Sequence, residues 1–253
     1  MRKLSLALLA GVALVGCGVD PQAENQEIVS NLVKAGFPAD DIQIVDNQVY
    51  VGRDAHVTLE ASLEMLQADK GAEQYRTTNL VSTSVKKICI NPTSAFNSYS
   101  RLSAGLDAAI ANYNSLGLSF TMVRGPATGC NANISARTMS GAGGSAGFPS
   151  GGLPYGIINI GTGLQSYSSG VNKHVISHEL GHCIGFRHSD YYNRSISCGG
   201  SATNEGTAGV GAILIPGTPS TATSGGSVMN SCFSSSSTGT WTSSDRTALY
   251  YLY

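Results

Sequence analysis

Residues 178–188 have the sequence H-E-L-G-H-C-I-G-F-R-H, the most informative pattern in the chain. Two histidines four residues apart, His178 and His182, lie on one face of a helix. Their imidazoles can therefore reach one zinc ion at about 2.0–2.1 Å. Gly185 can adopt a positive φ and end the helix, so that His188 returns as a third ligand.

Glu179 follows the first histidine, so its carboxylate can lie beside the metal without binding it. A general base is needed there to take a proton from zinc-bound water. Three neutral nitrogens leave one coordination position open, which is typical of catalytic rather than structural zinc. Copper, nickel and iron also bind histidine, but three imidazoles beside a glutamate, with no carboxylate ligand, favour Zn²⁺. The alternative is a set of solvated histidines on an ordinary helix.

These residues match the metzincin pattern H-E-x-x-H-x-x-G-x-x-H, and residues 178–190 resemble the bacterial dual-action HEIGH metallopeptidases, a metzincin branch near astacins and matrixins. The resemblance covers roughly residues 77–253. It implies an α+β, metzincin-like zincin fold, with a twisted mixed sheet and the zinc helix in an upper subdomain. The lower subdomain would be irregular and end in a C-terminal helix. The implied activity is that of a zinc metalloendopeptidase with one Zn²⁺ per chain and protein or peptide substrates.

A second metzincin hallmark is the Met-turn, and Ser227 to Asn230 suits it. The resemblance implies that Met229 packs beneath the three imidazoles; otherwise it is an ordinary core methionine. Ser231 stands where astacins and serralysins have a tyrosine, so no tyrosine ligand is implied. Asp190 is a candidate for bonding local backbone or Arg187, or else a solvated acid of a loop.

The region before the histidines alternates strand-like and helical patterns. Strands are predicted at 85–90, 118–123, 134–139 and 155–160, and helices at 97–116, capped by Ser98 or Ser100, and at 170–186. By the resemblance, Gly143 to Phe148 would line the cleft and pair with the substrate as an added strand. Residues 189–240 are rich in Gly, Ser, Thr and Asn and predict a long irregular region. A final helix follows, with Ser244-Asp245 as its cap.

The N-terminus predicts export. Residues 1–16 have the basic start and short apolar run of a signal peptide, and they lead into Leu14-Val15-Gly16-Cys17, which resembles a bacterial lipobox. The resemblance implies lipidation of Cys17 and anchoring to the bacterial cell envelope, at the outer membrane in a Gram-negative host because Gly18 follows. The alternatives are an ordinary secretory signal and release after removal of a pro-segment.

Residues 17–75 are predicted to be an N-terminal pro-segment and residues 76–253 the catalytic domain. Within the first part, helices are predicted at 24–37 and 59–66 and a strand at 42–51. Tyr50 to Asp54 imperfectly resembles the F-x-G-D stretch of astacin propeptides, whose aspartate blocks the metal, since Arg53 intervenes. Asp54 is therefore a candidate for latency, against a simple strand-to-turn. His56 is either an alternative inhibitory ligand or a surface histidine.

The overall charge is −1, and only 12% of residues are charged. Nothing indicates a nucleic-acid partner or a polybasic surface, and no oligomer is implied. Export permits disulfides, and an odd number of cysteines follows Cys17. The preferred pairs are Cys89–Cys130 and Cys198 with either Cys183 or Cys232.

Two other functions remain open at this point. One is a non-catalytic, zinc-containing surface binding lipoprotein, although such a site would not need a base at Glu179. The other is a zinc hydrolase of a different bond; the Gly-rich strand candidate favours peptides.

Overall fold

The computed structural model describes residues 21–66, 75–206 and 212–253. The predicted signal peptide, residues 1–16, and the predicted lipidation site Cys17 lie outside these ranges. None of the helices within them is long and apolar enough to span a bilayer.

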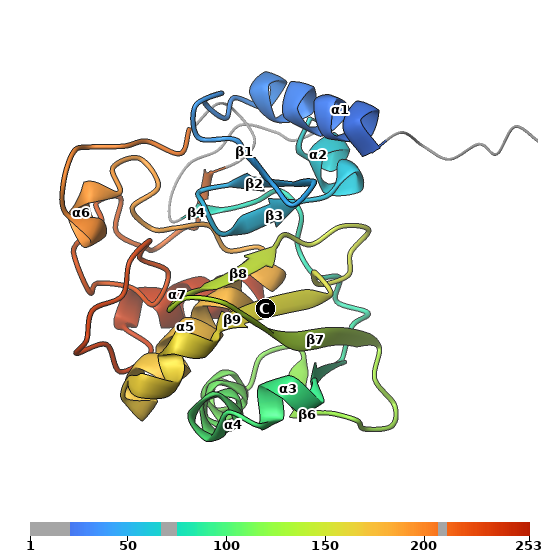
Figure 1. Cartoon of the computed structure of the whole chain (residues 1–253), viewed down its shortest axis with the longest axis vertical. Coiled ribbons are helices and arrows are strands. Elements are labelled where there is room, and N and C mark those ends of the chain that lie inside the picture. The colour runs from blue at the N-terminus through green and yellow to red at the C-terminus, as the bar shows by residue number, and fades with distance from the viewer. Residues whose placement is uncertain (1–20, 67–74, 207–211) are drawn as a thin grey trace, which may run out of the picture.

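The elements follow one another along the chain in Figure 1. The helices are α1 (Pro21–Lys34), α2 (Leu59–Met65), α3 (Ser94–Asn97), α4 (Ser100–Asn114), the 3₁₀ turn η1 (Thr162–Ser166), α5 (Ser169–Cys183), α6 (Ser195–Cys198) and α7 (Ser243–Leu252). The strands are β1 (Gln43–Val45), β2 (Gln48–Val51), β3 (Ala55–Val57), β4 (Tyr75–Arg76), β5 (Lys87–Pro92), β6 (Thr121–Arg124), β7 (Ala132–Met139), β8 (Gly144–Gly147), β9 (Ile157–Gly161) and β10 (Ile213–Leu214).

One mixed sheet of eight strands is the framework of the described residues, in the order β1-β2-β3-β8-β9-β7-β5-β6. Strands β6, β5, β7 and β9 are parallel neighbours, and β8 runs antiparallel to β9. The first three strands form an antiparallel meander, and β3 pairs in parallel with β8. The predicted α+β class, with a mixed sheet and a histidine-bearing helix, is confirmed.

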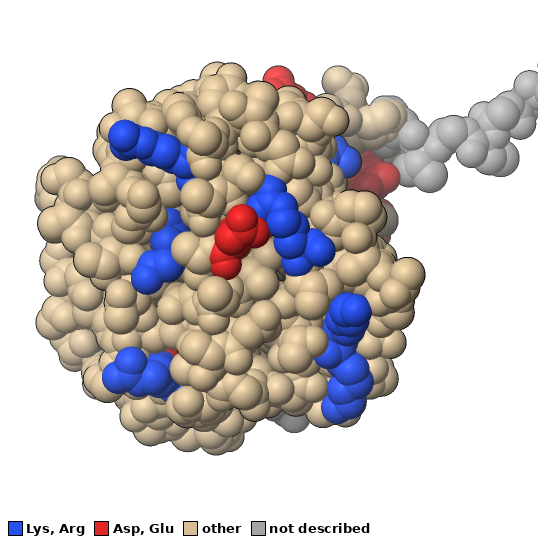
Figure 2. All heavy atoms as spheres, turned by 90° about the horizontal axis from the view of Figure 1, so that it is seen from below, with Lys and Arg blue, Asp and Glu red and all other residues tan. Residues whose placement is uncertain are grey.

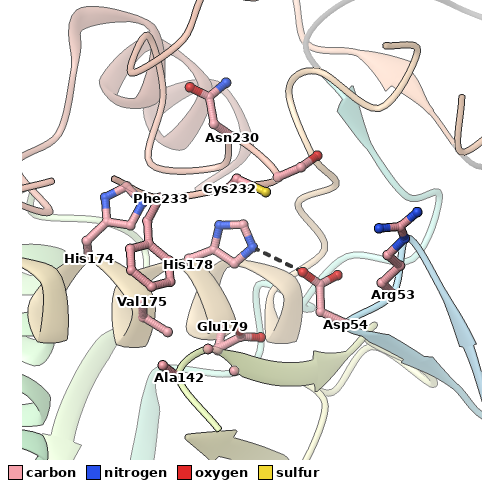
Figure 3. Close-up of a pocket in the computed structure, with 13 residues that line it drawn as sticks. Arg53, Asp54, Ala142, His174, Val175, His178, Glu179, Asn230, Cys232 and Phe233 are labelled. Atoms are coloured by element: carbon pink, nitrogen blue, oxygen red, sulfur yellow. Dashed lines mark ion pairs between the residues drawn. The ribbon is translucent and has the colours of Figure 1, made fainter. Parts of the chain in front are cut away.

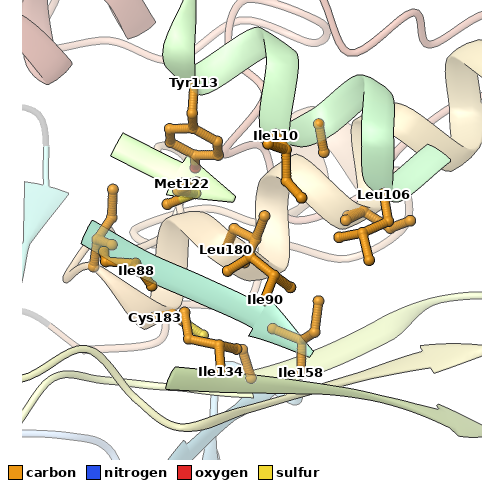
Figure 4. Close-up of a cluster of buried hydrophobic side chains, with 14 of the residues drawn as sticks. Ile88, Ile90, Leu106, Ile110, Tyr113, Met122, Ile134, Ile158, Leu180 and Cys183 are labelled. Carbon is orange, nitrogen blue, oxygen red and sulfur yellow. The ribbon is translucent and has the colours of Figure 1, made fainter. Parts of the chain in front are cut away.

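The main hydrophobic core lies between this sheet and the two long helices α4 and α5, which pack against each other (Figure 4). Leu106 and Ile110 of α4 and Leu180 of α5 meet Ile90 of β5 and Ile134 of β7 there. Burying such a side chain completely contributes roughly 1.5–3 kcal/mol. The core therefore fixes α5, and with it the histidines, against the sheet.

Residues 21–66, which we call the N-terminal segment, have a small hydrophobic cluster of their own. Ile28 and Leu32 of α1 pack with Val49 and Val57 of the meander, and Phe148, just after β8, completes the cluster. In Figure 1 this segment lies across the β8 edge of the sheet. The N-terminal segment is therefore docked on the rest of the chain by both sheet pairing and apolar contact.

The predicted strand at 42–51 is wrong in one respect, because it is a hairpin of two strands. Asp46 and Asn47 form its two-residue turn with φ of 48° and 61°. Such positive φ values at both central positions are those of a type I′ turn, which matches strand twist. The helix predicted at 97–116 likewise begins later, at Ser100, with Tyr99 rather than a serine at the N-cap.

Within the predicted irregular region 189–240, the described residues 189–206 and 212–240 are mainly irregular, and two disulfides are present among the residues that the structure describes. Cys89–Cys130 ties β5 to the loop before β7, and Cys198–Cys232 ties α6 to the segment after Met229. Cys183 is free and buried. Both preferred pairs are therefore confirmed, with Cys232 as the partner of Cys198.

The last helix, α7, begins at Ser243, two residues earlier than an N-cap at Ser244 would give. Its N-cap is Thr242, whose side chain accepts a hydrogen bond from the Asp245 backbone while the Asp245 carboxylate accepts one from the Thr242 backbone. This reciprocal pair is a capping box. Asp245 therefore supports the cap from the third helical position.

The surface carries few charges, as the composition predicts. The face in Figure 2 shows lysine and arginine side chains standing apart from one another among neutral residues. No continuous basic patch is visible on this face.

Candidate metal centre and active site

The helix α5 and the turn after it position the histidines. The Ser168 side chain caps the helix by accepting a hydrogen bond from the Val171 backbone. At the other end Gly185, with φ of 107°, reverses the chain, and the Phe186 N–H returns to the Gly181 carbonyl at 3.0 Å. This is the Schellman arrangement that a glycine permits. It brings His188 back toward the helix.

The three imidazoles meet at their Nε2 atoms. The Nε2 of His178 lies 3.0 Å from that of His182 and 3.2 Å from that of His188. Their Nδ1 atoms point outward, each to an oxygen that can only accept a hydrogen bond. These acceptors are the Val228 carbonyl for His178 (2.8 Å), the Phe186 carbonyl for His182 (2.8 Å) and the Glu205 carboxylate for His188 (2.7 Å).

This arrangement fits Zn²⁺. Because each Nδ1 donates its proton outward, each Nε2 presents a lone pair to the common centre. Ligands at about 2.0–2.1 Å in tetrahedral geometry are roughly 3.3 Å apart, close to the Nε2 separations found. The structure brings the three predicted histidines together, and His178, His182 and His188 would therefore hold the ion.

Asp54 of the N-terminal segment occupies the fourth side of this centre (Figure 3). Its carboxylate lies 3.1 Å from His188 Nε2 and 3.8 Å from the Nε2 atoms of His178 and His182. The predicted alternative, His56, is not at the centre; its Nδ1 lies 2.5 Å from the Tyr155 hydroxyl instead. The aspartate thus stands where a fourth ligand would bind.

Glu179 lies beside the histidines and is almost fully buried, at 2% exposure. One oxygen, Oε2, has no hydrogen-bond partner among the described residues. Strand β8 closes on it so tightly that a Cβ atom at Gly144 would lie 2.3 Å from Oε1. The carboxylate is therefore held next to the centre with an oxygen free to accept a proton.

The electrostatics of the centre favour a cation. Burial raises the pKa of Glu179 well above its ordinary value, and the charge of Asp54 adds to this. Burial alone would also raise the pKa of Asp54, but His188 and the other histidines hold it well below its usual range. Burial lowers the pKa of His188, yet the carboxylates of Asp54 and Glu205 raise it to about 10. Without a metal the two carboxylates thus favour a proton on His188, whose place a bound cation would take, whereas burial and the neighbouring histidines lower the pKa of His182 to about 3.

The predicted Met-turn lies against the centre. The Val228 carbonyl orients His178, and the Met229 carbonyl accepts the Ser189 N–H at 2.8 Å. The buried Met229 side chain lies against α5 at Gly181, where a Cβ would come 2.5 Å from its sulfur. The turn therefore holds one imidazole and packs under the helix that carries two.

Asp190 is a buried structural acid rather than a solvated one. It accepts hydrogen bonds from the backbone and hydroxyl of Ser231, both at 2.8 Å, and from the hydroxyl of Ser197 at 2.5 Å. The prediction of a local backbone partner is therefore wrong, because the backbone N–H that the Asp190 carboxylate binds lies 41 residues away, at Ser231.

A cavity of about 310 Å³ opens beside the centre (Figure 3). Asp54 enters it from one side, and His178 and Glu179 line it from α5. Strand β8 contributes Gly144, and Phe233 closes the opposite wall. The cavity adjoins both the metal ligands and the carboxylate.

Sequence reasoning missed Glu205, the acceptor for His188. It follows the third histidine by 17 residues in an irregular stretch, so no periodic pattern marks it. A signal was nevertheless present: Arg194 and Glu205 are the only charged residues between Asp190 and Asp245.

Three imidazoles converging beside a buried glutamate of the same helix define the class of zinc metallopeptidases. The sequence model of the dual-action HEIGH metallo-peptidases matches residues 49–253. The chain therefore belongs to the dual-action HEIGH metallo-peptidase family. No curated protein is matched.

Some solved structures also show similarity to this chain. High choriolytic enzyme 1, a hatching enzyme zinc-protease from Oryzias latipes (medaka fish), is 18% identical, with a TM-score of 0.31 over 46% of this chain. The match spans 56% of the hatching enzyme's length. Two structures of myroilysin are 14% and 13% identical, with TM-scores of 0.39 and 0.38. The two matches cover 69% and 74% of this chain, and 97% and 88% of the myroilysin chains.

Proposed function

We propose that this metallopeptidase is an exported endopeptidase in which Glu179 is the general base and the N-terminal segment blocks the active site. The observation that carries the hydrolytic part is the convergence of three Nε2 lone pairs next to a buried, unpartnered carboxylate oxygen. A structural zinc site would need no such carboxylate.

The chemistry divides between the metal and the chain. When bound, Zn²⁺ supplies a Lewis acid that lowers the pKa of water and polarises a carbonyl. Glu179 accepts the proton that the attacking water loses and passes it to the departing amine. Its raised pKa makes it a stronger base, and Gly144 holds it in place.

Strand β8 would align the peptide. Its edge away from β9 now pairs with β3, in the register Ala55 with Ala146. A substrate could add to the same edge by backbone hydrogen bonds, which demand little of its sequence. The substrate and the N-terminal segment would therefore compete for one strand position.

Asp54 would provide the second part of the block. The Asp54 carbonyl accepts the Ala146 N–H at 3.0 Å, and its side chain faces the three Nε2 atoms. A carboxylate there takes the coordination position that water needs. The chain would thus be latent until this segment leaves.

Export and anchoring rest on the N-terminus and on the disulfides. Cys89–Cys130 and Cys198–Cys232 suit an oxidising compartment. The lipobox-like run before Cys17 supports a lipid anchor in the cell envelope. Cys17→Ser should move the protein from the membrane fraction to the soluble one and abolish incorporation of labelled fatty acid; unchanged labelling would refute the anchor.

Casein hydrolysis tests the enzymatic proposal. The Asp54→Ala chain is used because the aspartate would otherwise block the site. We expect hydrolysis that a zinc chelator stops and added zinc restores. Adding Glu179→Gln should reduce the rate about 10²–10⁴-fold while zinc binding is retained. A double variant as fast as Asp54→Ala would refute the base, and hydrolysis indifferent to the chelator would refute the metal.

A further inference from the structure

A buried ionic cluster surrounds the third histidine. Besides accepting from His188 Nδ1, Glu205 lies 2.5 Å from Arg194 Nη1 and 3.3 Å from Arg187 Nη2. All three charged side chains are almost fully buried, at 1% for Glu205, 6% for Arg194 and 2% for Arg187. Ions this deep are costly to desolvate, and such clusters add little to folding stability over apolar packing. Their position at a metal ligand suggests a functional reason.

His188 has a different kind of support from the other two ligands. The Nδ1 protons of His178 and His182 go to backbone carbonyls, whereas that of His188 goes to a carboxylate at 2.7 Å. An anionic acceptor fixes the ring and makes the opposite nitrogen a stronger donor to a metal. His188 needs this most, because it follows the helix and no helical turn holds it.

The same cluster touches the N-terminal segment. Arg194 donates to the Gly52 carbonyl at 2.5 Å, and Arg187 lies 4.7 Å above the ring of Phe37. Gly52 has a φ of 60°, and a Cβ there would come 2.9 Å from Glu205 Oε2. The loop that carries Asp54 therefore rests directly on the carboxylate that orients His188.

We propose that Glu205 is the positioning residue of the metal centre: it orients His188 and raises the zinc affinity, with Arg194 holding the Glu205 carboxylate in place. The inference rests on the proposed assignment of the three histidines as ligands, and not on peptide hydrolysis. Arg194 at the same time makes this carboxylate the docking point for the loop at Gly52.

The test is the zinc dissociation constant of the full chain, measured by competition with a chromophoric chelator. Glu205→Gln keeps the shape but removes the charge, and we expect zinc to bind about 10–100-fold more weakly. The matched control is Asp190→Asn, which alters a buried acid of the same region that contacts no histidine. It should lower the melting temperature but leave the zinc dissociation constant within about twofold of the parent, well under a tenfold change.

A spectroscopic signature separates positioning from general destabilisation. With Co²⁺ in place of zinc, Glu205→Gln should shift the visible absorption bands, and Asp190→Asn should not. If both variants weaken zinc binding in proportion to their loss of metal-free stability, Glu205 is merely structural and the inference is overturned.

Glu205→Asp keeps the test decisive if Glu205→Gln fails to fold. It retains the charge but withdraws the carboxylate from His188, so zinc binding should weaken in the same direction. Parent-like affinity in this variant would contradict the inference. Failure of the parent chain to bind one zinc would instead overturn the metal site itself, and so the proposed function.

Discussion

At the scale of single residues, the centre depends on which nitrogen of each imidazole carries its proton. Val228, Phe186 and Glu205 each offer an oxygen to an Nδ1 atom, so all three Nε2 atoms are left with lone pairs. None of the three acceptors belongs to the H-E-x-x-H pattern. The pattern supplies the three imidazoles, and the three acceptors outside it leave each Nε2 atom able to bind a metal.

Asp54 is the residue whose loss should change activity most simply. Without its carboxylate the fourth coordination position is open, so Asp54→Ala should raise chelator-sensitive casein hydrolysis by the full chain at least about tenfold, the equivalent of 1.4 kcal/mol. Arg53→Ala is the control, because Arg53 lines the same cavity but has no carboxylate that could bind the metal. Equal rates for the parent and Asp54→Ala would show that the aspartate does not enforce latency.

At the scale of elements, helix α5 and strand β8 lie in contact beside the metal centre. The helix carries His178, His182 and the proposed base Glu179, and the strand runs so close that only glycine fits at position 144. The turn at Gly185 then closes the third side of the centre. Because the base and the strand are in contact, an error in one should disturb the other.

Gly144→Ala tests this contact. The added methyl group would displace the Glu179 carboxylate, and displacement of a catalytic group by about 1 Å can cost 10²-fold in rate. In the Asp54→Ala background we expect a fall in casein hydrolysis of about that size, with zinc affinity preserved. Gly143→Ala is the matched control, since nothing lies within 4 Å of its Cβ position. A Gly144→Ala chain as active as this control would contradict the placement of Glu179.

At the scale of the whole molecule, the metal centre joins parts that are far apart in sequence. Ligands come from α5 and the turn after it, His178 is held by Val228 and His188 by Glu205, and Asp54 comes from the N-terminal segment. A metal that binds only the folded chain should therefore stabilise the whole fold.

Metal removal measures this linkage. Zinc at 100 times its dissociation constant contributes about 2.7 kcal/mol. For a chain of this size, that corresponds to a rise in melting temperature of roughly 5–10 °C. Calorimetry of the full chain with chelator and after zinc is restored should show it, whereas His182→Ala should melt at one temperature in both conditions. An equal melting temperature of the parent chain with and without zinc would contradict the proposed metal centre.

The sequence predicted most of the local structure and the heart of the site. Periodic apolar spacing marked α4, and a run rich in histidine and apolar residues marked α5. A β-branched run marked β5, and the spacing of three histidines with Gly185 marked the metal centre. The prediction was less accurate for turns and helix caps, where several neighbouring residues are suitable, as at the hairpin turn Asp46-Asn47 and at the Thr242 cap. Turns and caps rest on one or two residues, so neighbouring candidates differ little in energy.

The order of residues was thus enough to predict the class of enzyme and the clustering of the three histidines, because a helix and one glycine turn fix those groups relative to one another over eleven positions. Only the tertiary structure decided that Glu205 supports His188 and that Asp54 faces the ion-binding nitrogens. These contacts join segments through irregular chain and across a sheet edge. No local periodicity encodes such distances; they follow from how the N-terminal segment and the 189–242 region pack on the helix.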